Sequence, residues 1–573
     1  MKLRLTFALA CAALPVVRCP GQPIYDIPHL QKQGTASQLI VDGRPFLALA
    51  GELGNNTSSS LETMQPVWRT LVSGNLNCVL AGLSWAQMEP LEGKYEFAMV
   101  DGLLQESRRS NLKLVLLWFG SWKNGFSSYA PYWVKRDYQR FPRIRIQGGK
   151  NIELLSAFGD ASRDCEARAF RALMRHIKEV DGTAHTVVAM QVENEPGVLR
   201  DTRDRSPVAN QAFKGPVPEQ LTRYLQRRKD SLIPEFRDVW AQSGFKTSGS
   251  WEEIFGPGKP EDLDLPARKI GAEEGRIESK KLHWPVDEIF MAWHYAIYVD
   301  RVIQEGKAEY NIPMFVNAWL QQPSTAWPGA YPSGGPVPQV HDVWRAGAPG
   351  VDMLAPDVFS QDFDEVCELF GRNGNPLLFP GTGSNAANVL MAFGKYNAIG
   401  YSPYWHLRFS PFSMEGGVGP ETPLAAAYRL ISEMTPAIVA QQGGTAMTAV
   451  RLNPGSPPLK TRLGSYTLEL SQTGGLPVPN LQETKAAAQG AAILIAAGPD
   501  EFYFGSIGPE LRIGFTPSTP GPQAVGLGDV EEGRFEGGQW RVVRHLSGDD
   551  TKQGEVLMLQ PNTILRVSVY RYE

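Results

Sequence analysis

The sequence predicts an α/β fold, a (β/α)8 TIM barrel, followed by a β-rich, sandwich-like C-terminal domain. Eight short apolar runs alternate with amphipathic stretches over about 360 residues, the pattern of strands buried on both faces of a parallel sheet. Beyond residue 415 the texture changes to short alternating segments separated by turn residues. The 573 residues are 42% hydrophobic and 20% charged, enough apolar material for a large core.

Each apolar run predicts one barrel strand. In chain order the runs are Phe46–Ala50, Cys78–Leu83, Leu112–Trp118, Thr186–Val192, Met314–Trp319, Val351–Ala355, Pro376–Phe379 and Ala398–Tyr401. An open doubly wound sheet is the alternative, and it is disfavoured because no GxGxxG motif follows the first run.

The stretches between the runs have helical periodicity and predict the outer helices. They are Val100–Ser110, Cys165–Glu179, Gln220–Gln226 and Phe290–Glu305. Two polar segments interrupt this pattern. We expect 246–287 to be a solvated insertion and 321–342, rich in Pro, Gly and Trp, to be a rim loop.

These patterns divide the chain into a barrel with inserted loops at 22–440 and a β-rich accessory domain at 441–573. A helix at Pro423–Val439 ends the barrel part. Four alternating segments then predict strands: Ser465–Leu470, Ala491–Ala496, Trp540–His545 and Thr563–Tyr572.

Charge and cysteine content exclude several classes of function. A net charge of −4 lacks the basic excess of a nucleic-acid-binding protein. Cys78, Cys165 and Cys367 form no CxxC motif, and the eight histidines form no HExxH motif, so we expect no metal and no other cofactor. No apolar stretch reaches the roughly 18 residues of a membrane span, and no Gly-rich phosphate loop supports a nucleotide-dependent enzyme.

The first 21 residues are typical of a secretory signal peptide. Lys2 and Arg4 precede the apolar run Leu5–Val17, and small or turn-forming residues follow at Cys19 to Gly21. We therefore expect a secreted or extracytoplasmic protein. The alternative is a buried N-terminal strand or helix.

The fourth apolar run ends in the polar cluster Gln191-Val192-Glu193-Asn194-Glu195. Catalytic groups of (β/α)8 barrels lie at the carboxyl ends of the strands, so two acidic residues here indicate a cleft. The alternative is a strand that ends in solvated polar residues. Regular alternation puts Glu193 and Glu195 on one side of the strand, unless its end twists or bulges.

This pentapeptide resembles the acid/base signature of glycoside hydrolase family 35, the β-galactosidases, in the branch with an extra β-rich C-terminal domain. The resemblance covers roughly residues 35–440. Further matching segments are Gly51-Glu52-Leu53, Trp85 with Glu89-Pro90, Trp118–Asn124, Asn317–Leu320, Tyr331–Gly335 and Ala355-Pro356-Asp357. The resemblance implies retaining hydrolysis with Glu195 as general acid/base, Asn194 as a ligand of the sugar 2-hydroxyl and Glu193 in a supporting role.

The nucleophile of that family follows the seventh strand as a glutamate after proline. Here the segment reads Asn375-Pro376-Leu377-Leu378-Phe379-Pro380-Gly381-Thr382-Gly383, so the glutamate position is Gly381. Three explanations stay open. The chain is a catalytically silent, sugar-binding relative; another acid, Asp357 or Glu368, reaches the site; or the glycine is a sequence error or an allelic loss, since Glu and Gly codons can differ by a single base.

The resemblance also implies a set of sugar contacts. Aromatic side chains stack on the apolar face of a pyranose, while a few polar groups fix its orientation. The expected substrate-binding residues, besides Asn194, are Glu52, Trp85, Trp122, Asn317, Trp319, Tyr331 and Trp405. For any one tryptophan, ordinary core packing is the alternative. Two overlapping glycosylation sequons at Asn55 and Asn56 fall in the first strand's loop, where site residues are expected.

The implied activity is the hydrolysis of a terminal β-linked galactose or a related glycoside. The expected partner is a carbohydrate, either a β-galactoside or a plant cell-wall oligosaccharide. The alternative is a carbohydrate-binding protein that keeps the fold and the cleft without catalysis.

Overall fold

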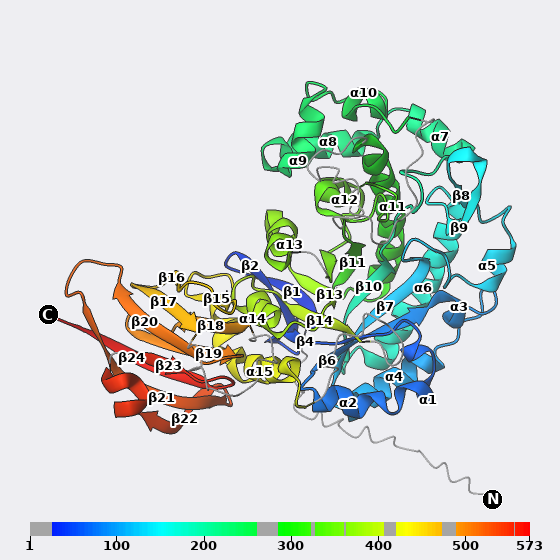
Figure 1. Ribbon diagram of the computed structural model, residues 1–573. Coiled ribbons are helices and arrows are strands. Elements are labelled where there is room, and N and C mark those ends of the chain that lie inside the picture. Colours follow the sequence, from blue (N-terminus) through cyan, green and yellow to red (C-terminus); the bar gives the residue numbers. More distant parts are fainter. Residues whose placement is uncertain are drawn as a thin grey trace, which may run out of the picture.

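The computed structural model describes residues 26–260, 285–321, 327–359, 362–405, 420–472, 489–554 and 556–573. The chain forms a closed parallel barrel and, beyond it, two antiparallel sheets at the C-terminus (Figure 1). The expected signal peptide lies outside the described residues.

All eight predicted strands are present and close the barrel. The first one is split into two short pieces, β4 and β5, which both pair with the eighth strand, β14. Every barrel pairing is parallel, and β13 pairs with β14 to complete the ring. The strands are β4 (Ala48–Leu49), β5 (Glu52–Leu53), β6 (Cys78–Ser84), β7 (Lys113–Lys123), β10 (Val187–Asn194), β11 (Met314–Trp319), β12 (Met353–Val358), β13 (Leu378–Thr382) and β14 (Gly400–Trp405).

Amphipathic helices cover the outer face of the barrel. In α4 the buried residues Val100, Leu103, Leu104 and Ser107 recur at helical spacing, and two arginines occupy the last turn. The principal helices are α4 (Ala98–Arg109), α6 (Asp160–Asp181), α11 (Pro285–Glu309), α12 (His341–Gly347), α13 (Phe363–Phe370), α14 (Ala386–Gly394) and α15 (Pro423–Gln441). Shorter elements in the loops are α1 (Leu61–Met64), α2 (Val67–Ser73), α3 (Trp85–Met88), α5 (Tyr132–Arg136), α7 (Pro207–Lys214), α8 (Glu219–Arg228), α9 (Pro234–Ala241), α10 (Trp251–Phe255), β8 (Arg143–Arg145) and β9 (Asn151–Leu155).

A small antiparallel sheet closes the amino end of the barrel. It consists of β1 (His29–Gln33), β2 (Ala36–Val41) and β3 (Arg44–Phe46). Leu39 and Val41 of β2 share one apolar cluster with residues inside the barrel, such as Leu80 and Phe315. The opposite, carboxyl end is therefore the open end at which a site can form.

The C-terminal part is a sandwich of two antiparallel sheets around its own apolar core. One sheet has the strand order β15-β18-β19-β24-β21-β22, and the other has the order β16-β17-β20-β23. Helices α14 and α15 pack between the barrel and the first sheet (Figure 1). The strands are β15 (Met447–Leu452), β16 (Leu459–Leu463), β17 (Tyr466–Gln472), β18 (Gly490–Ala496), β19 (Glu501–Ile507), β20 (Leu511–Pro517), β21 (Ala524–Glu536), β22 (Gln539–Leu546), β23 (Leu557–Leu559) and β24 (Ile564–Tyr572).

The expected insertion at 246–287 is described only at 246–260 and 285–287, and the rest of it lies outside the described residues. Within 246–287, helix α10 buries Trp251, Ile254 and Phe255, and the Trp251 ring lies 5.2 Å from that of Phe290 in α11. The apolar residues of α10 share one helical face, so it packs instead of being solvated. Segment 327–342 lies between β11 and α12, at the carboxyl end of the barrel where a rim loop was expected, and most of it is buried because it packs against α11.

Candidate active site

Four residues singled out from the sequence meet at the carboxyl end of the barrel. Glu195 follows β10, Asp357 lies near the end of β12, Gly381 near the end of β13, and Glu52 begins β5. In the strand register Asp357 is the direct partner of Gly381. The remaining candidate, Glu368, is exposed on helix α13, so the explanation that it supplies the second carboxylate is wrong.

The end of β10 departs from regular strand geometry. Glu193 has a φ of 64° and Glu195 a φ of 47°, in the left-handed region that side-chain-bearing residues rarely adopt. The pairing of β10 with β7 also shifts register between Val192 and Asn194. The backbone therefore breaks the alternation that would have placed Glu193 and Glu195 on one side.

Glu193 turns toward β7 and stays inside the protein. Its carboxyl oxygens accept the backbone N–H groups of Ser121 at 3.0 Å and Trp122 at 2.7 Å. Burial raises the pKa of Glu193 well above its usual range, and the nearby Glu166 raises it further. The expected supporting role agrees with this geometry, because Glu193 fixes the end of β7 next to the site.

Asn317 connects Glu195 with Asp357. The Asn317 side-chain oxygen accepts the backbone N–H of Glu195 at 2.9 Å, and the Asn317 amide nitrogen donates to Asp357 Oδ2 at 2.6 Å. The Glu195 and Asp357 carboxyls also lie within hydrogen-bond reach of each other. Burial, first, and the neighbouring Glu195, second, raise the pKa of Asp357 well above its usual range.

Each of these two carboxyls keeps one buried oxygen without a partner. Glu195 Oε2 and Asp357 Oδ1 have no hydrogen-bond donor among the described residues. Unpartnered buried polar atoms are rare in folded proteins and costly to maintain. Such atoms indicate groups that are kept for a ligand or a reaction.

Lys123 is the cation that acts on this group of carboxyls. Burial raises the pKa of Glu195, of Asp357 and of Glu52, the last to about 8, while Lys123 opposes the shift at all three. The Lys123 ammonium donates to the Asn194 side-chain oxygen at 2.9 Å and lies 4.7 Å from the centre of the Phe119 ring. The sequence pattern did not single out Lys123, although it lies within the matched segment Trp118–Asn124.

Gly381 lies directly among these carboxyls. A Cβ atom added at Gly381 would lie 3.0 Å from Asp357 Oδ1 and 3.0 Å from Glu52 Oε2. That spacing is tighter than ordinary van der Waals contact, so the two carboxyl groups occupy the space in which a side chain at 381 would extend.

An open cavity of about 460 Å³ adjoins the site. Lys123 and Asn124 line it together with the first loop's Asn55 and Asn56 and with Tyr129, whose hydroxyl donates to Asn56 at 3.0 Å. Its volume is in the range of pockets that hold a small ligand. Asn55 and Asn56 therefore line the cavity beside the carboxyls, where the sequence placed them.

Three of the expected stacking residues lie in the interior instead. Trp85, Trp122 and Tyr331 have no exposed ring surface. Their polar groups are bound by protein: Trp85 Nε1 donates to Glu89 at 2.7 Å, Trp122 Nε1 to the Leu155 carbonyl at 2.9 Å, and the Tyr331 hydroxyl to Glu288 at 2.8 Å. Rings packed on all sides cannot stack on a sugar, so the expectation for these three needs correction.

The other expected contacts divide differently. Trp319 at the end of β11 is half-buried, and its backbone pairs with Asp357, so it lies beside the carboxyls. Trp405 pairs with Leu53 through the backbone at the end of β14. Glu52, Asn194 and Asn317 all lie at the site, as expected.

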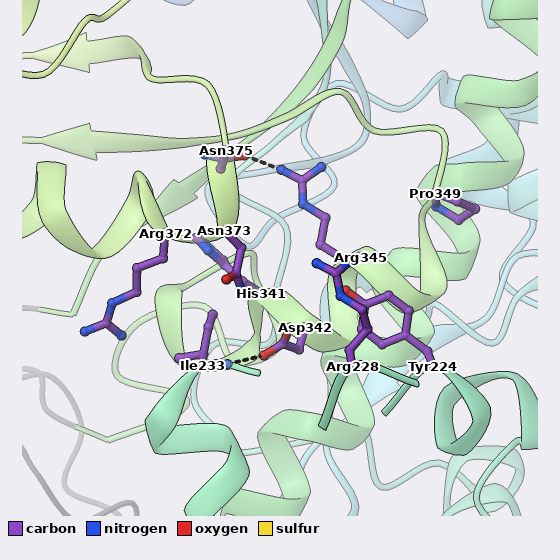
Figure 2. A pocket seen from close by; sticks show the side chains of 10 residues that line it. All are labelled: Tyr224, Arg228, Ile233, His341, Asp342, Arg345, Pro349, Arg372, Asn373 and Asn375. Atoms are coloured by element: carbon purple, nitrogen blue, oxygen red, sulfur yellow. Dashed lines mark hydrogen bonds between the residues drawn. The ribbon is translucent and has the colours of Figure 1, made fainter. Parts of the chain in front are cut away.

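A second cavity, of about 290 Å³, is lined by residues of α8 and α12 and of the segments that precede β12 and β13 (Figure 2). Its lining residues Pro349 and Asn375 precede β12 and β13, so this cavity is separate from the cluster of Glu195, Asp357 and Glu52, which lies where the strands end. Arg345 donates from this cavity to the Val351 carbonyl and to Asn375, and Arg372 pairs with Glu235 at 2.8 Å. These contacts tie together the segments that lead into the two strands.

Within the described residues, no group of three or more His, Cys, Asp or Glu side chains is arranged to hold a metal ion. The described helices include none that is long and apolar enough to span a membrane.

Two family models match the chain. Residues 58–292 match a model described as β-galactosidase (glycoside hydrolase 42), and residues 424–558 match one described as a domain of unknown function, DUF5597. The model that matches the barrel is that of family 42, so the expected family number, 35, is wrong. Its description, β-galactosidase, agrees with the expected type of enzyme. Short segments at strand ends, even several of them, do not separate families that share a barrel and a type of activity. A search of curated proteins finds no match.

Several solved structures are similar to the chain at low identity. The β-galactosidase of Rahnella sp. R3 is 14% identical over 68% of this chain and 56% of its own, with a TM-score of 0.42. That of Bacillus circulans sp. alkalophilus is 14% identical over 68% and 56%, with a TM-score of 0.43. A catalytic mutant of a GH42 β-galactosidase from G. stearothermophilus is 11% identical over 92% and 98%, with a TM-score of 0.44. The chain thus spans little more than half the length of the first two.

Proposed function

We propose that the chain is a glycoside hydrolase of the β-galactosidase type that removes a terminal β-linked galactose or a related sugar. The observation that carries this proposal is the buried Glu195 at the end of the fourth barrel strand, within hydrogen-bond reach of a second carboxyl. Its neighbour Asn194 accepts from Lys123, which lines an open cavity. The family match over residues 58–292 supports the same class of reaction. The substrate we propose is therefore a carbohydrate.

Glu195 is the general acid/base in this proposal. Burial raises the pKa of its carboxyl, which favours the protonated form needed to donate to the glycosidic oxygen. Asn194 supports the sugar. Its side-chain oxygen is held by Lys123, and its amide nitrogen, which has no acceptor among the described residues, is available for a sugar hydroxyl.

A catalytically silent carbohydrate-binding protein is the second candidate. The observation that favours it is Gly381, which stands where the resemblance to family 35 places the nucleophile. A silent relative would bind galactosides but would not turn them over, so binding and hydrolysis measured on one preparation separate the two candidates.

The test is the hydrolysis of aryl β-galactosides by the native chain and by Glu195→Gln, with binding of galactose measured by calorimetry. We expect Glu195→Gln to lower kcat/KM by roughly 10²- to 10⁴-fold for a poor leaving group and much less for an activated one. The pH–rate profile of Glu195→Gln should lack the fall at alkaline pH, because in the native chain that fall reports the loss of the Glu195 proton.

Glu368→Gln, at the exposed glutamate of α13, is the matched control and should behave like the native chain. Binding without any hydrolysis by the native chain would favour the silent alternative. Hydrolysis that is insensitive to Glu195→Gln would remove Glu195 from its assigned role.

A further inference from the structure

Gly381 leaves the seventh strand without a carboxylate, but the structure places one beside it. Asp357 and Gly381 are register partners on neighbouring parallel strands, which lie about 4.8 Å apart. Asp357 Oδ1 lies 3.0 Å from the position that a Gly381 Cβ would take. The sixth strand therefore delivers a carboxyl oxygen to the place where a side chain from the seventh strand would begin.

We infer that Asp357 is the catalytic nucleophile of this chain, displaced by one strand from the usual position; this inference rests on the proposed glycosidase function. The geometry fits the role. Asp357 Oδ2 is fixed by the Asn317 amide at 2.6 Å, while Oδ1 is buried and has no partner among the described residues. One oxygen is positioned and the other is left to attack.

Asn317 also positions Asp357 next to Glu195, the general acid. The same amide side chain accepts the Glu195 backbone N–H, so one residue fixes both members of the pair. Burial and contact with Glu195 raise the pKa of Asp357, so Asp357 attacks once its proton has passed to Glu195, which leaves the one acid and one carboxylate that retaining hydrolysis requires. In this state the two are in contact, so an entering sugar separates them to the roughly 5–5.5 Å of a retaining pair.

Glu52 is less suited to the attack. It lies near the same point, with Oε2 3.0 Å from the Gly381 Cβ position, but no described residue donates a hydrogen bond to its carboxyl. Burial raises the pKa of Glu52 to about 8 and that of Asp357 well above its usual range, so protonation does not separate the two; the hydrogen bond from Asn317, which fixes Asp357 alone, does.

The reaction proceeds in two balanced steps. Glu195 donates its proton to the glycosidic oxygen as the C1–O bond breaks and its electron pair goes to the leaving alcohol, while Asp357 Oδ1 forms a bond to C1. A water then attacks C1, Glu195 takes the water's proton, and the Asp357 carboxylate leaves with the bonding pair. The sum is glycoside plus water giving free sugar plus alcohol, with the configuration at C1 retained.

The test traps the intermediate on the native full-length chain. A 2-deoxy-2-fluoro β-galactoside with a dinitrophenyl leaving group is added, and the labelled peptide is located by mass spectrometry. We expect one fluorosugar per chain, on the peptide that contains Asp357. Labelling should be lost in Asp357→Asn and kept in Glu52→Gln, and azide added to Asp357→Ala should yield the α-galactosyl azide.

The outcomes separate the two proposals. Label on Glu52, or turnover without label and with inverted product, overturns the role of Asp357 and leaves the glycosidase function standing. If the native chain shows no turnover and takes up no label, both the role of Asp357 and the glycosidase function are overturned. Since the decisive measurement uses the native chain, the result does not depend on whether Asp357→Asn folds.

Discussion

At the scale of single residues, Asn317 and Lys123 determine what the carboxyl cluster can do. Asn317 holds Asp357 Oδ2 and the Glu195 backbone with one amide, which fixes the Asp357 carboxyl and the main chain of Glu195 without adding charge. Lys123 supplies positive charge to three buried carboxyls whose pKa values burial raises. Together they allow acidic groups to stay buried and reactive at the mouth of the barrel.

Lys123→Met tests the electrostatic part of this arrangement. Lys123 lowers the pKa of Glu52, Glu195 and Asp357, so its removal raises all three. The acidic rise and the alkaline fall of kcat/KM should both move to higher pH. Loss of the charge-assisted hydrogen bond to Asn194 should also lower kcat/KM by about 1.5–3 kcal/mol, roughly 10- to 150-fold.

The measurement is kcat/KM against pH for an aryl β-galactoside. Lys150→Met removes an exposed lysine and should leave the profile unchanged. A profile that moves to lower pH in Lys123→Met would show that this cation does not govern the site.

The site also shows what a sequence pattern predicts and what it omits. The motif placed Glu195, Asn194, Asn317 and Glu52 at one end of the barrel, because strand ends of a parallel barrel face the same way. The role of Asp357 beside Gly381 depends on the register of β12 against β13, which apolar runs do not encode. Likewise, aromatic content cannot distinguish a ring that lines a cleft from Trp122, which packs between Tyr295 and Tyr298.

At the scale of elements, the end of β7 supports the end of β10. Trp118 Nε1 and the Ser121 backbone donate to Glu166 of α6, and Ser121 and Trp122 donate to Glu193 of β10. Three elements are thereby held together by two buried carboxyl groups. The strained backbone of Glu193 and Glu195 persists because these contacts fix it.

Gly120→Ala tests this support. A Cβ at Gly120 would lie 2.6 Å from Glu166 Cδ and 2.6 Å from Trp118 Nε1, and both groups are buried. We expect a loss of about 1–3 kcal/mol or more in the free energy of unfolding, because a packed site has no room for the methyl group. Denaturant unfolding followed by fluorescence measures it.

The matched control is Gly514→Ala in β20, where the nearest atom to an added Cβ is 4.0 Å away. We expect it to be neutral or slightly stabilising, because alanine in a strand loses less backbone freedom than glycine. Equal stability of Gly120→Ala and the native chain would mean that α6 and β7 are not packed as described.

At the scale of the whole molecule, the barrel and the first C-terminal sheet share one core. Leu430 and Met434 of α15 belong to the same buried cluster as Ala449 of β15 and Ile493 of β18. The eight barrel strands were predictable because both their faces are buried, which makes their sequences continuously apolar. The shared core was not predictable from the sequence, because the apolar face of a helix does not indicate which sheet it packs against.

A shared core predicts cooperative unfolding. We expect scanning calorimetry of the full chain to give one transition, in which loss of hydrolytic activity coincides with unfolding of the C-terminal sheets. Ile493→Ala, in the shared core, should lower the free energy of unfolding by about 2–5 kcal/mol. It should lower the temperature at which activity is lost and the temperature at which the C-terminal sheets unfold by the same amount. Two separate transitions, with the barrel remaining active after the sheets unfold, would contradict this prediction.

The most direct test of the account follows the product of the native chain by proton NMR during hydrolysis of an aryl β-galactoside. A chain that uses Glu195 and Asp357 as a retaining pair produces β-galactose first, and the α-anomer appears only by mutarotation. Release of α-galactose first, or no release at all at any pH between 4 and 9, would contradict the account.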